Sequence, residues 1–191
     1  MNVLKGKKLI LGSSSPRRKE LLKGLDIPFE TRVFEIEEKY PSDLSHRQIP
    51  EFLARLKATA FKNKLSENEV VITSDTIVVF NDKLLTKPKD KIQALAMLHQ
   101  LSGGMHQVFT AVCVTSNNKQ VCFTDESNVY FKTLDKEEID YYIEKYHPYD
   151  KAGGYGIQDW IGFIAIERIE GSYYNIMGLP THKLYDVLKD F

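Results

Sequence analysis

The residue with the strongest chemical signal is an acid inside an apolar segment. Asp75 lies in Val70–Phe80, a run that is apolar except for its middle residues. An ionised carboxylate in such a strand is costly unless it is paired, bound to a metal or open to a cleft. The alternative is a structural Asp that accepts a hydrogen bond from neighbouring backbone. Because the run is apolar on both sides of Asp75, we favour a functional acid, with Thr76 on the opposite face of the strand.

A second signal is a serine-rich turn followed by two arginines. An apolar run, Lys8–Gly12, leads into Ser13–Arg18, where Ser15 and Pro16 are typical of the start of a helix. The free N–H groups and positive dipole end of such a helix favour an anion, and arginines add bidentate charge. The alternative is an ordinary capped helix with surface arginines.

Other charged residues are weaker candidates when taken alone. Lys87 precedes a proline in a loop after a strand, and Lys57 lies on a predicted helix downstream of Glu37 and Glu38. A solvated surface charge is the better interpretation of each of these residues when it is taken alone.

A glycine-rich loop, Asp150–Gln158, could close over a ligand. Within it, Lys151 carries charge and the amide of Gln158 offers one acceptor and one donor group to a base edge. The alternative is a long connection that uses Gly for turns. His106 follows a Gly-Gly pair, and we expect a lone His there to be structural or exposed.

Hydrophobic periodicity and turn residues predict the elements that position these groups. Strands are predicted at 8–12, 29–34, 70–80, 108–115, 120–131 and 162–170; helices are predicted at 16–25, 50–64, 90–101, from 133 or 135 to about 145, and at 181–189. Mixed strands and helices indicate an α/β protein with a mixed sheet.

Composition excludes several classes of function. The chain has 191 residues with 26 Lys plus Arg and 26 Asp plus Glu, so no net charge attracts a nucleic-acid backbone. It has no apolar run of about 18 residues, so we expect no membrane span, and the short N-terminal apolar stretch does not predict a signal peptide. Cys113 and Cys122 lie in apolar runs and are predicted to be buried free thiols, from which we infer a reducing cytoplasm.

Six segments together resemble the Maf family, and they do so in order along essentially the whole chain. They are LILGSSSPRRKELL, TSDTIVVF, TKPKD, LSGGMHQVFTAV, DKAGGYGIQ and GSYYNIMGLP. The resemblance implies one domain over residues 1–191, with two lobes sharing a mixed, elongated sheet flanked by helices and a central cleft, similar to the inosine triphosphate pyrophosphatases.

The resemblance also implies an activity, which is hydrolysis of a nucleoside triphosphate to the monophosphate and pyrophosphate with a divalent metal, Mg²⁺ or Mn²⁺. Arg17, Thr76 and Gln158 stand where the family's pyrimidine branch, acting on dTTP and UTP, has the same residue types. A house-cleaning role in the nucleotide pool follows from that branch.

The roles implied by the resemblance fall into three groups. Asp75 would activate or orient the attacking water and, with Glu38, would hold the metal, although Glu37 is adjacent and the assignment could shift by one. The groups that would neutralise or contact phosphates are Ser13, Arg18, Lys57, Lys87 and, more weakly, Lys151. Arg17, Thr76 and Gln158 would contact the base or the sugar.

This sequence departs from the family's pattern at three places, one of which is Gly154, where Ala is familiar. Ser74 precedes Asp75 where Ala is familiar, and Asp159 and Trp160 replace a more usual Gly-containing pair. A bulky Trp160 at the mouth of a base pocket would narrow it. Alternative readings are a Maf-type pyrophosphatase for a purine or methylated triphosphate, and a nucleotide-sensing regulator of cell division without turnover. The resemblance also raises a homodimer as an assembly.

Overall fold

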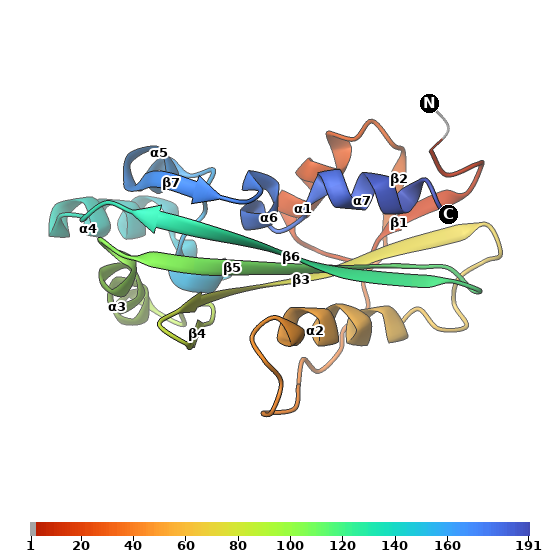
Figure 1. Ribbon diagram of the computed structural model, residues 1–191, viewed down its shortest axis with the longest axis horizontal. Coiled ribbons are helices and arrows are strands. Elements are labelled where there is room, and N and C mark those ends of the chain that lie inside the picture. The colour runs from red at the N-terminus through yellow and green to blue at the C-terminus, as the bar shows by residue number, and fades with distance from the viewer. Residues whose placement is uncertain (1–2) are drawn as a thin grey trace. The chain divides into compact units, whose positions relative to one another are not determined.

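A computed structural model describes residues 3–191 and contains one seven-stranded mixed sheet with helices packed on it (Figure 1). The strands are β1 (Lys8–Leu11), β2 (Phe29–Thr31), β3 (Glu69–Phe80), β4 (Lys83–Leu85), β5 (Met105–Thr115), β6 (Gln120–Phe131) and β7 (Ile166–Glu170). The helices are α1 (Pro16–Lys23), α2 (Gln48–Thr59), α3 (Lys91–Leu101), α4 (Lys136–Tyr146), α5 (Trp160–Ala165), α6 (Tyr173–Met177) and α7 (Thr181–Leu188), with short 3₁₀ turns η1 (Pro148–Asp150) and η2 (Ala152–Gly154).

The strand order is β2-β1-β3-β5-β6-β7, and β4 pairs with β3. β1 runs parallel to β2 and β3, whereas β4 is antiparallel to β3 and β7 is antiparallel to β6. The prediction of an α/β fold with a mixed sheet is therefore confirmed.

The chain divides into two compact units. The first comprises the described residues up to Asp75 together with Thr110–Asp125 and Gly178–Phe191, and the second comprises Thr76–Phe109 and Glu126–Met177. Both units are discontinuous in sequence, and β3, β5 and β6 contribute residues to each of them. The central cleft implied by the family resemblance stays a prediction.

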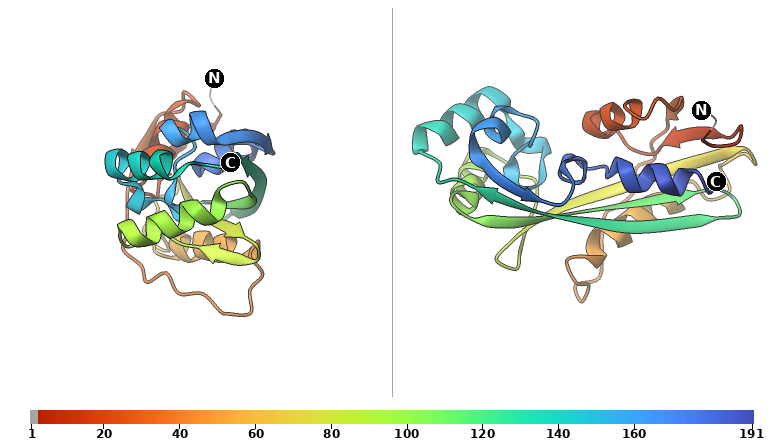
Figure 2. Two further views of the ribbon diagram at one scale, coloured as in Figure 1. Left: turned by 90° about the vertical axis from the view of Figure 1, so that its left-hand side faces the viewer. Right: turned by 45° about the horizontal axis from the view of Figure 1, so that its top comes forward.

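In the first unit, helices cover both faces of the sheet. The Thr73 hydroxyl on β3 donates to the Ala54 carbonyl of α2, whereas the next residue, Ser74, donates to the Gly178 carbonyl just before α7. Successive side chains on a strand point to opposite faces. Accordingly, α2 lies across the sheet from α1 and α7 (Figure 2). Buried apolar residues of β1 and β3, such as Leu11 and Ile72, form the layer between them.

Local sequence signals explain where the first elements start. The Ser15 side chain accepts a hydrogen bond from the Arg18 N–H, and Pro16 is the first residue of α1, as predicted. Asp90 caps α3 in the same way. Asn81 and Asp82 both have positive φ, which allows the tight turn between β3 and β4.

The second unit differs from the prediction after Trp160. The predicted strand at 162–170 was wrong in its first part, because residues up to Ala165 form α5 and only Ile166–Glu170 is a strand. A short apolar run is ambiguous between buried helix and strand, and this one follows Asp159, a residue type that favours helix starts. Sequence reasoning also missed the short elements β4 and α6.

The cysteines correct a second prediction. Cys113 on β5 and Cys122 on β6 are joined by a disulfide, so they are not free thiols. The Ser116 N–H donates to the Lys119 carbonyl, which closes the β5–β6 hairpin and places the two cysteines opposite each other, with Cα atoms 4.1 Å apart. That distance suits a directly opposed antiparallel pair. The cysteines therefore no longer support a reducing compartment, and the cytoplasmic location stays a prediction.

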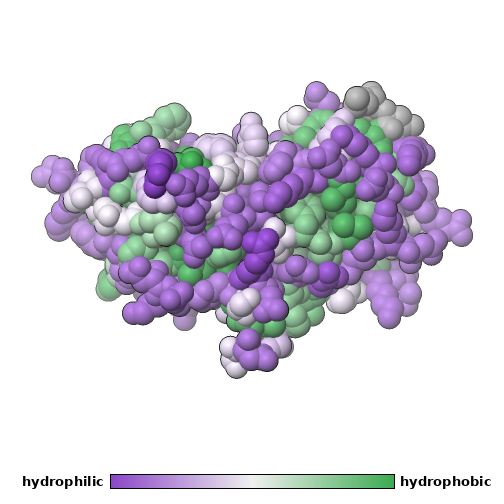
Figure 3. Space-filling view, viewed as in Figure 1, coloured by the Kyte–Doolittle hydropathy of each residue, from purple (hydrophilic) through white to green (hydrophobic). Residues whose placement is uncertain are grey.

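The surface is mostly hydrophilic on the face that Figure 3 shows, with hydrophobic colour at the position of α5, where Phe163 is exposed. None of the helices in residues 3–191 has the length and apolar character needed to cross a bilayer.

Candidate active site

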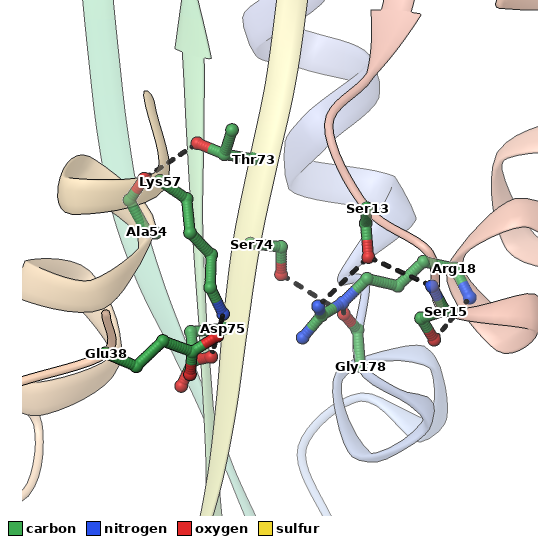
Figure 4. Close-up of polar contacts among 10 residues, drawn as sticks. All are labelled: Ser13, Ser15, Arg18, Glu38, Ala54, Lys57, Thr73, Ser74, Asp75 and Gly178. Carbon is green, nitrogen blue, oxygen red and sulfur yellow. Dashed lines mark hydrogen bonds and ion pairs between the residues drawn. The ribbon is translucent and has the colours of Figure 1, made fainter. Parts of the chain in front are cut away.

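Two carboxylates of the first unit converge on one ammonium group. Lys57 Nζ lies 2.5 Å from an Asp75 carboxylate oxygen and 3.1 Å from a Glu38 carboxylate oxygen. The Asp75 and Lys57 side chains are 13% and 17% exposed, whereas Glu38 is 51% exposed. The predicted acid is thus largely buried and paired with a lysine that also contacts Glu38 (Figure 4).

The secondary structure explains why these groups meet. β1 pairs with β3 only as far as Leu11 and Ile72, so Asp75 lies beyond the end of β1. Lys57 is in the last turn of α2 and extends across to the strand. Glu38 comes from the long irregular segment that precedes α2.

The structure also distinguishes between the two adjacent glutamates. Glu38 contacts Lys57, whereas Glu37 is 73% exposed and pairs with Lys39. Of the two, Glu38 is therefore the residue placed to act together with Asp75.

The serine-rich turn is held closed by its own side chains and by a distant carbonyl. The Ser13 hydroxyl oxygen accepts hydrogen bonds from the Ser15 N–H and, at 3.4 Å, from the Arg18 guanidinium. Arg18 Nε donates to the Gly178 carbonyl at 2.9 Å, and the Ser74 hydroxyl donates to the same carbonyl at 3.3 Å. This carbonyl therefore connects the turn to β3 at the residue next to Asp75.

The Arg18 guanidinium lies within electrostatic range of the carboxylates. Burial lowers the pKa of Arg18 from its ordinary value, and the charges of Asp75 and Glu38 act in the opposite direction. An arginine stays protonated under such shifts, so Arg18 remains a fixed positive charge. We refer to Arg18, Glu38, Lys57 and Asp75 as the charged cluster.

The charged cluster has two positive and two negative side chains, so it carries no net charge. It offers cationic donors for phosphate oxygens and carboxylate oxygens for a hard cation. Within residues 3–191, no three His, Cys, Asp or Glu side chains come close enough to form a metal site by themselves.

The remaining predicted site residues belong to the second unit, except Arg17. Arg17 is half-buried on α1 beside Arg18. Thr76 is half-buried on β3, and Lys87 is exposed in the loop after β4. That loop packs on the glycine-rich segment, because the Gly153 N–H donates to the Thr86 carbonyl at 3.2 Å.

Lys151 and Gln158 have different surroundings. Lys151 Nζ lies 2.8 Å from an Asp150 oxygen and 3.7 Å from an Asp159 oxygen, and its side chain is 12% exposed. The side-chain oxygen of Gln158 is buried and has no hydrogen-bond partner among residues 3–191. A buried acceptor without a partner is costly, which makes Gln158 the clearer ligand-contacting candidate of the two.

His106 is placed as a core residue. It is 1% exposed, and its ring packs edge to face against Phe131 and Tyr155. His106 Nε2 is hydrogen-bonded to the Tyr155 hydroxyl at 2.7 Å, and burial lowers the pKa of His106 to about 3. A neutral, enclosed imidazole supports the structural interpretation of this residue.

Sequence reasoning missed the Gly178 carbonyl and the hydroxyl of Tyr142. A backbone acceptor has no residue-type signature, so only the fold could identify it. Tyr142 lies on α4 and contacts Gly156 in the glycine-rich loop and Asp159 directly after it. A tyrosine within a predicted helix has no pattern that indicates such a contact.

Together, the fold and the charged cluster define an α/β protein with a serine-rich turn at a helix N-terminus and two carboxylates that share one lysine. The family model described as "Maf-like protein" matches residues 8–191. The chain belongs to this family, as the six segments indicated.

Several named proteins match nearly the whole of this chain. A Porphyromonas gingivalis protein named dTTP/UTP pyrophosphatase is 52% identical over 98% of this chain and 96% of its own length. A Parabacteroides distasonis protein of the same name is 53% identical over 98% of each chain, and one from Flavobacterium johnsoniae is 50% identical over 97% and 95%. The solved Staphylococcus aureus Ham1 protein aligns with 69% of this chain and 88% of its own at 16% identity and a TM-score of 0.48.

Proposed function

We propose that this protein hydrolyses dTTP and UTP to the nucleoside monophosphate and pyrophosphate, and so removes such triphosphates from the nucleotide pool. The names of relatives that are about half identical over nearly the whole chain support the proposal. The observation that carries it is the position of Lys57 between Asp75 and Glu38, with Arg18 in electrostatic range.

The charge balance of the cluster supports a divalent metal. Two cations and two carboxylates sum to zero, which leaves no surplus positive charge for a triphosphate. Mg²⁺ is commonly bound by one or two carboxylates plus substrate phosphates, so Asp75 and Glu38 fit this kind of site. They would hold Mg²⁺ or Mn²⁺, and the ion would supply charge neutralisation for the phosphates when bound.

The protein's own groups then have distinct roles. Asp75 accepts the proton of the water that attacks at the α–β phosphoanhydride bond, and that bond breaks to release pyrophosphate. Lys57 holds the Asp75 carboxylate in place and, with Arg18 and Lys87, neutralises the phosphates and the departing pyrophosphate. Ser13 and the N–H groups of the first turn of α1 bind phosphate oxygens.

The unpartnered oxygen of Gln158 supports a role in reading the base. Thymine and uracil present an N–H donor between carbonyl acceptors, which matches the acceptor and donor of one amide group. Arg17 and Thr76 would add contacts to the base or sugar. The proposed preference for pyrimidine triphosphates rests on this match.

The experiment that tests the proposal is a triphosphate panel in Mg²⁺ or Mn²⁺ with separate detection of phosphate and pyrophosphate. We expect pyrophosphate from dTTP and UTP in preference to purine and methylated triphosphates. Tight binding of triphosphates without pyrophosphate release would instead identify a nucleotide sensor.

A matched pair of variants tests the role of the acid. Asp75→Asn keeps the size of the side chain and is expected to lower kcat by about 10²- to 10⁴-fold. Asp82→Asn, in the exposed turn of the β3–β4 hairpin, is expected to leave kcat within about twofold, because Asn also tolerates positive φ. Near wild-type turnover in Asp75→Asn would remove the proton-acceptor role.

A further variant tests base reading. Gln158→Ala should change the ratio of dTTP to purine triphosphate hydrolysis more than it changes kcat. An unaltered substrate profile would exclude Gln158 from recognition of the base.

A further inference from the structure

We propose that Asp159, through the Tyr142 hydroxyl, is a positioning residue that fixes the backbone carrying Gln158 and thereby sets the preference for pyrimidine triphosphates. The inference rests on the proposed function. It concerns the position at which this chain departs from the family's more usual Gly-containing pair.

The first step of the argument is a relay of two hydrogen bonds. The Tyr142 hydroxyl donates to an Asp159 carboxylate oxygen at 2.8 Å and accepts from the Gly156 N–H at 3.0 Å. One hydroxyl on α4 therefore holds residues 156–159 at two points, one on each side of Gln158. Tyr142 itself is fully buried, so its hydroxyl has a fixed position.

The second step is the protonation of this hydroxyl. Burial raises the pKa of Tyr142, and the hydrogen bond to the Asp159 carboxylate raises it further. The phenol therefore stays protonated and keeps donating to Asp159. A hydrogen bond to a charged acceptor is also stronger than a neutral one.

The third step is the closeness of packing around the relay. A Cβ at position 156 would lie 2.6 Å from an Asp159 carboxylate oxygen and 3.0 Å from Lys151 Cε. Only Gly fits there without displacing the carboxylate. The Asp159 N–H also donates to the Gly156 carbonyl at 3.0 Å, so residues 156–159 form a tight turn with Gln158 inside it.

The fourth step connects this turn to specificity. The side-chain oxygen of Gln158 is buried without a partner, so its position relative to a base depends on the backbone that carries it. If the Gln158 amide were misplaced, the protein would discriminate less well between bases, whereas hydrolysis at the phosphates would be affected less. Trp160 starts α5 and packs edge to face on Tyr141, which secures the other end of the turn.

The test compares Asp159→Asn and Tyr142→Phe with the wild-type protein. Each variant should raise KM for dTTP and UTP by about tenfold, as expected for loss of a hydrogen bond to a charged group, with kcat within about twofold. Each should also reduce the ratio of pyrimidine to purine triphosphate hydrolysis. Tyr142→Phe removes a single oxygen and protects the test against misfolding of the Asp159 variant.

The matched control is Asp150→Asn. Asp150 pairs with the same lysine, Lys151, and is 57% exposed, whereas it is Asp159 that accepts the hydrogen bond from the Tyr142 hydroxyl. The Asp150→Asn variant should change KM and base preference by less than about twofold relative to the wild-type protein, because release of Lys151 alone does not move the turn at residues 156–159. Equal effects in the Asp150 and Asp159 variants would assign the effect to Lys151 and overturn the inference.

A double-variant cycle shows whether Asp159 acts through Gln158. Combining Asp159→Asn with Gln158→Ala should give no further loss of base preference beyond Gln158→Ala alone, because interacting residues are non-additive. Fully additive losses would contradict the positioning role.

Hydrogen exchange separates this inference from the proposed function. The amides of Gly156–Gln158 should exchange about tenfold faster in Asp159→Asn and Tyr142→Phe, whether or not the protein hydrolyses dTTP. Unchanged exchange would reject the positioning role, whereas a wild-type protein that releases no pyrophosphate would reject only the proposed reaction.

Discussion

Titratable groups have opposite surroundings in two regions of the molecule, which are the charged cluster of the first unit and the His106–Tyr155 pair of the second unit. Asp75 is partly exposed and pairs with Lys57, whereas His106 is enclosed by aromatic rings that offer no counter-charge. A group that must exchange protons with a ligand needs both access and a partner charge. The comparison shows that a residue type capable of acid–base chemistry becomes an active-site residue only where its surroundings give it access to a ligand and a partner charge.

The largest effect should come from breaking the charged cluster. Lys57→Met leaves the Asp75 and Glu38 carboxylates without their shared cation, and we expect kcat for dTTP to fall by about 10²- to 10³-fold. Steady-state kinetics with pyrophosphate detection measures the change. Arg55→Met, on the same helix but in an exposed pair with Glu51, should change kcat less than about twofold. A similar loss in both variants would mean that α2 contributes only stability.

Reduction of the Cys113–Cys122 disulfide tests how much this covalent bond contributes to the stability of the first unit. The bond closes a short loop, and chain entropy predicts that reduction lowers the free energy of unfolding by about 2 to 3 kcal/mol. Urea unfolding with and without dithiothreitol measures this difference. The Cys113→Ala, Cys122→Ala double variant should not respond to the reductant, and an equal response in that variant would show that the reductant acts elsewhere.

Because the His106–Tyr155 pair buries a neutral imidazole, the free energy of unfolding should decrease at acidic pH. The pKa of His106 is about 3 in the folded protein and about 6.5 when unfolded, so the unfolded chain binds more protons between these values. The stability that the neutral imidazole contributes is present above pH 6.5 and is lost as the pH falls towards 3, by up to about 1.4 kcal/mol per pH unit.

The measurement is the free energy of unfolding at pH 7, 6 and 5. His106→Gln should flatten this pH dependence relative to the wild-type protein, whereas His99→Gln, at an exposed position, should not. Parallel curves for all three proteins would mean that His106 titrates in the folded state.

The smallest effect is expected at the residue next to Asp75. Ser74→Ala removes a 3.3 Å hydrogen bond to the Gly178 carbonyl, which Arg18 continues to occupy. We expect less than about a threefold change in kcat/KM, equivalent to the lower range of a neutral hydrogen bond. A loss as large as that of Lys57→Met would show that this hydroxyl takes part in the reaction.

The sequence predicted features whose causes are local. The strand around Asp75 follows from an apolar run, the start of α1 follows from Ser15 and Pro16, and α3 follows from its Asp90 cap. The run 162–165 was wrongly predicted as a strand, because the helix that contains it depends on packing against α4 as well as on residue type.

Non-local features were harder to predict. Lys57 could not be told from a solvated lysine until α2 was placed against β3. The disulfide had a signal that could have been used, since Cys113 and Cys122 are symmetric about the Asn117-Asn118 turn. No residue pattern could have indicated the Gly178 carbonyl as the shared acceptor.

The hydrogen bond from Arg18 to Gly178 spans 160 positions of sequence. During synthesis from the N-terminus, the serine-rich turn leaves the ribosome long before its acceptor has been made. The nascent chain therefore cannot fix Arg18 in its final orientation until the segment that contains Gly178 has emerged. The ability to act on triphosphates should consequently arise late in translation, and it should not increase gradually as the chain grows.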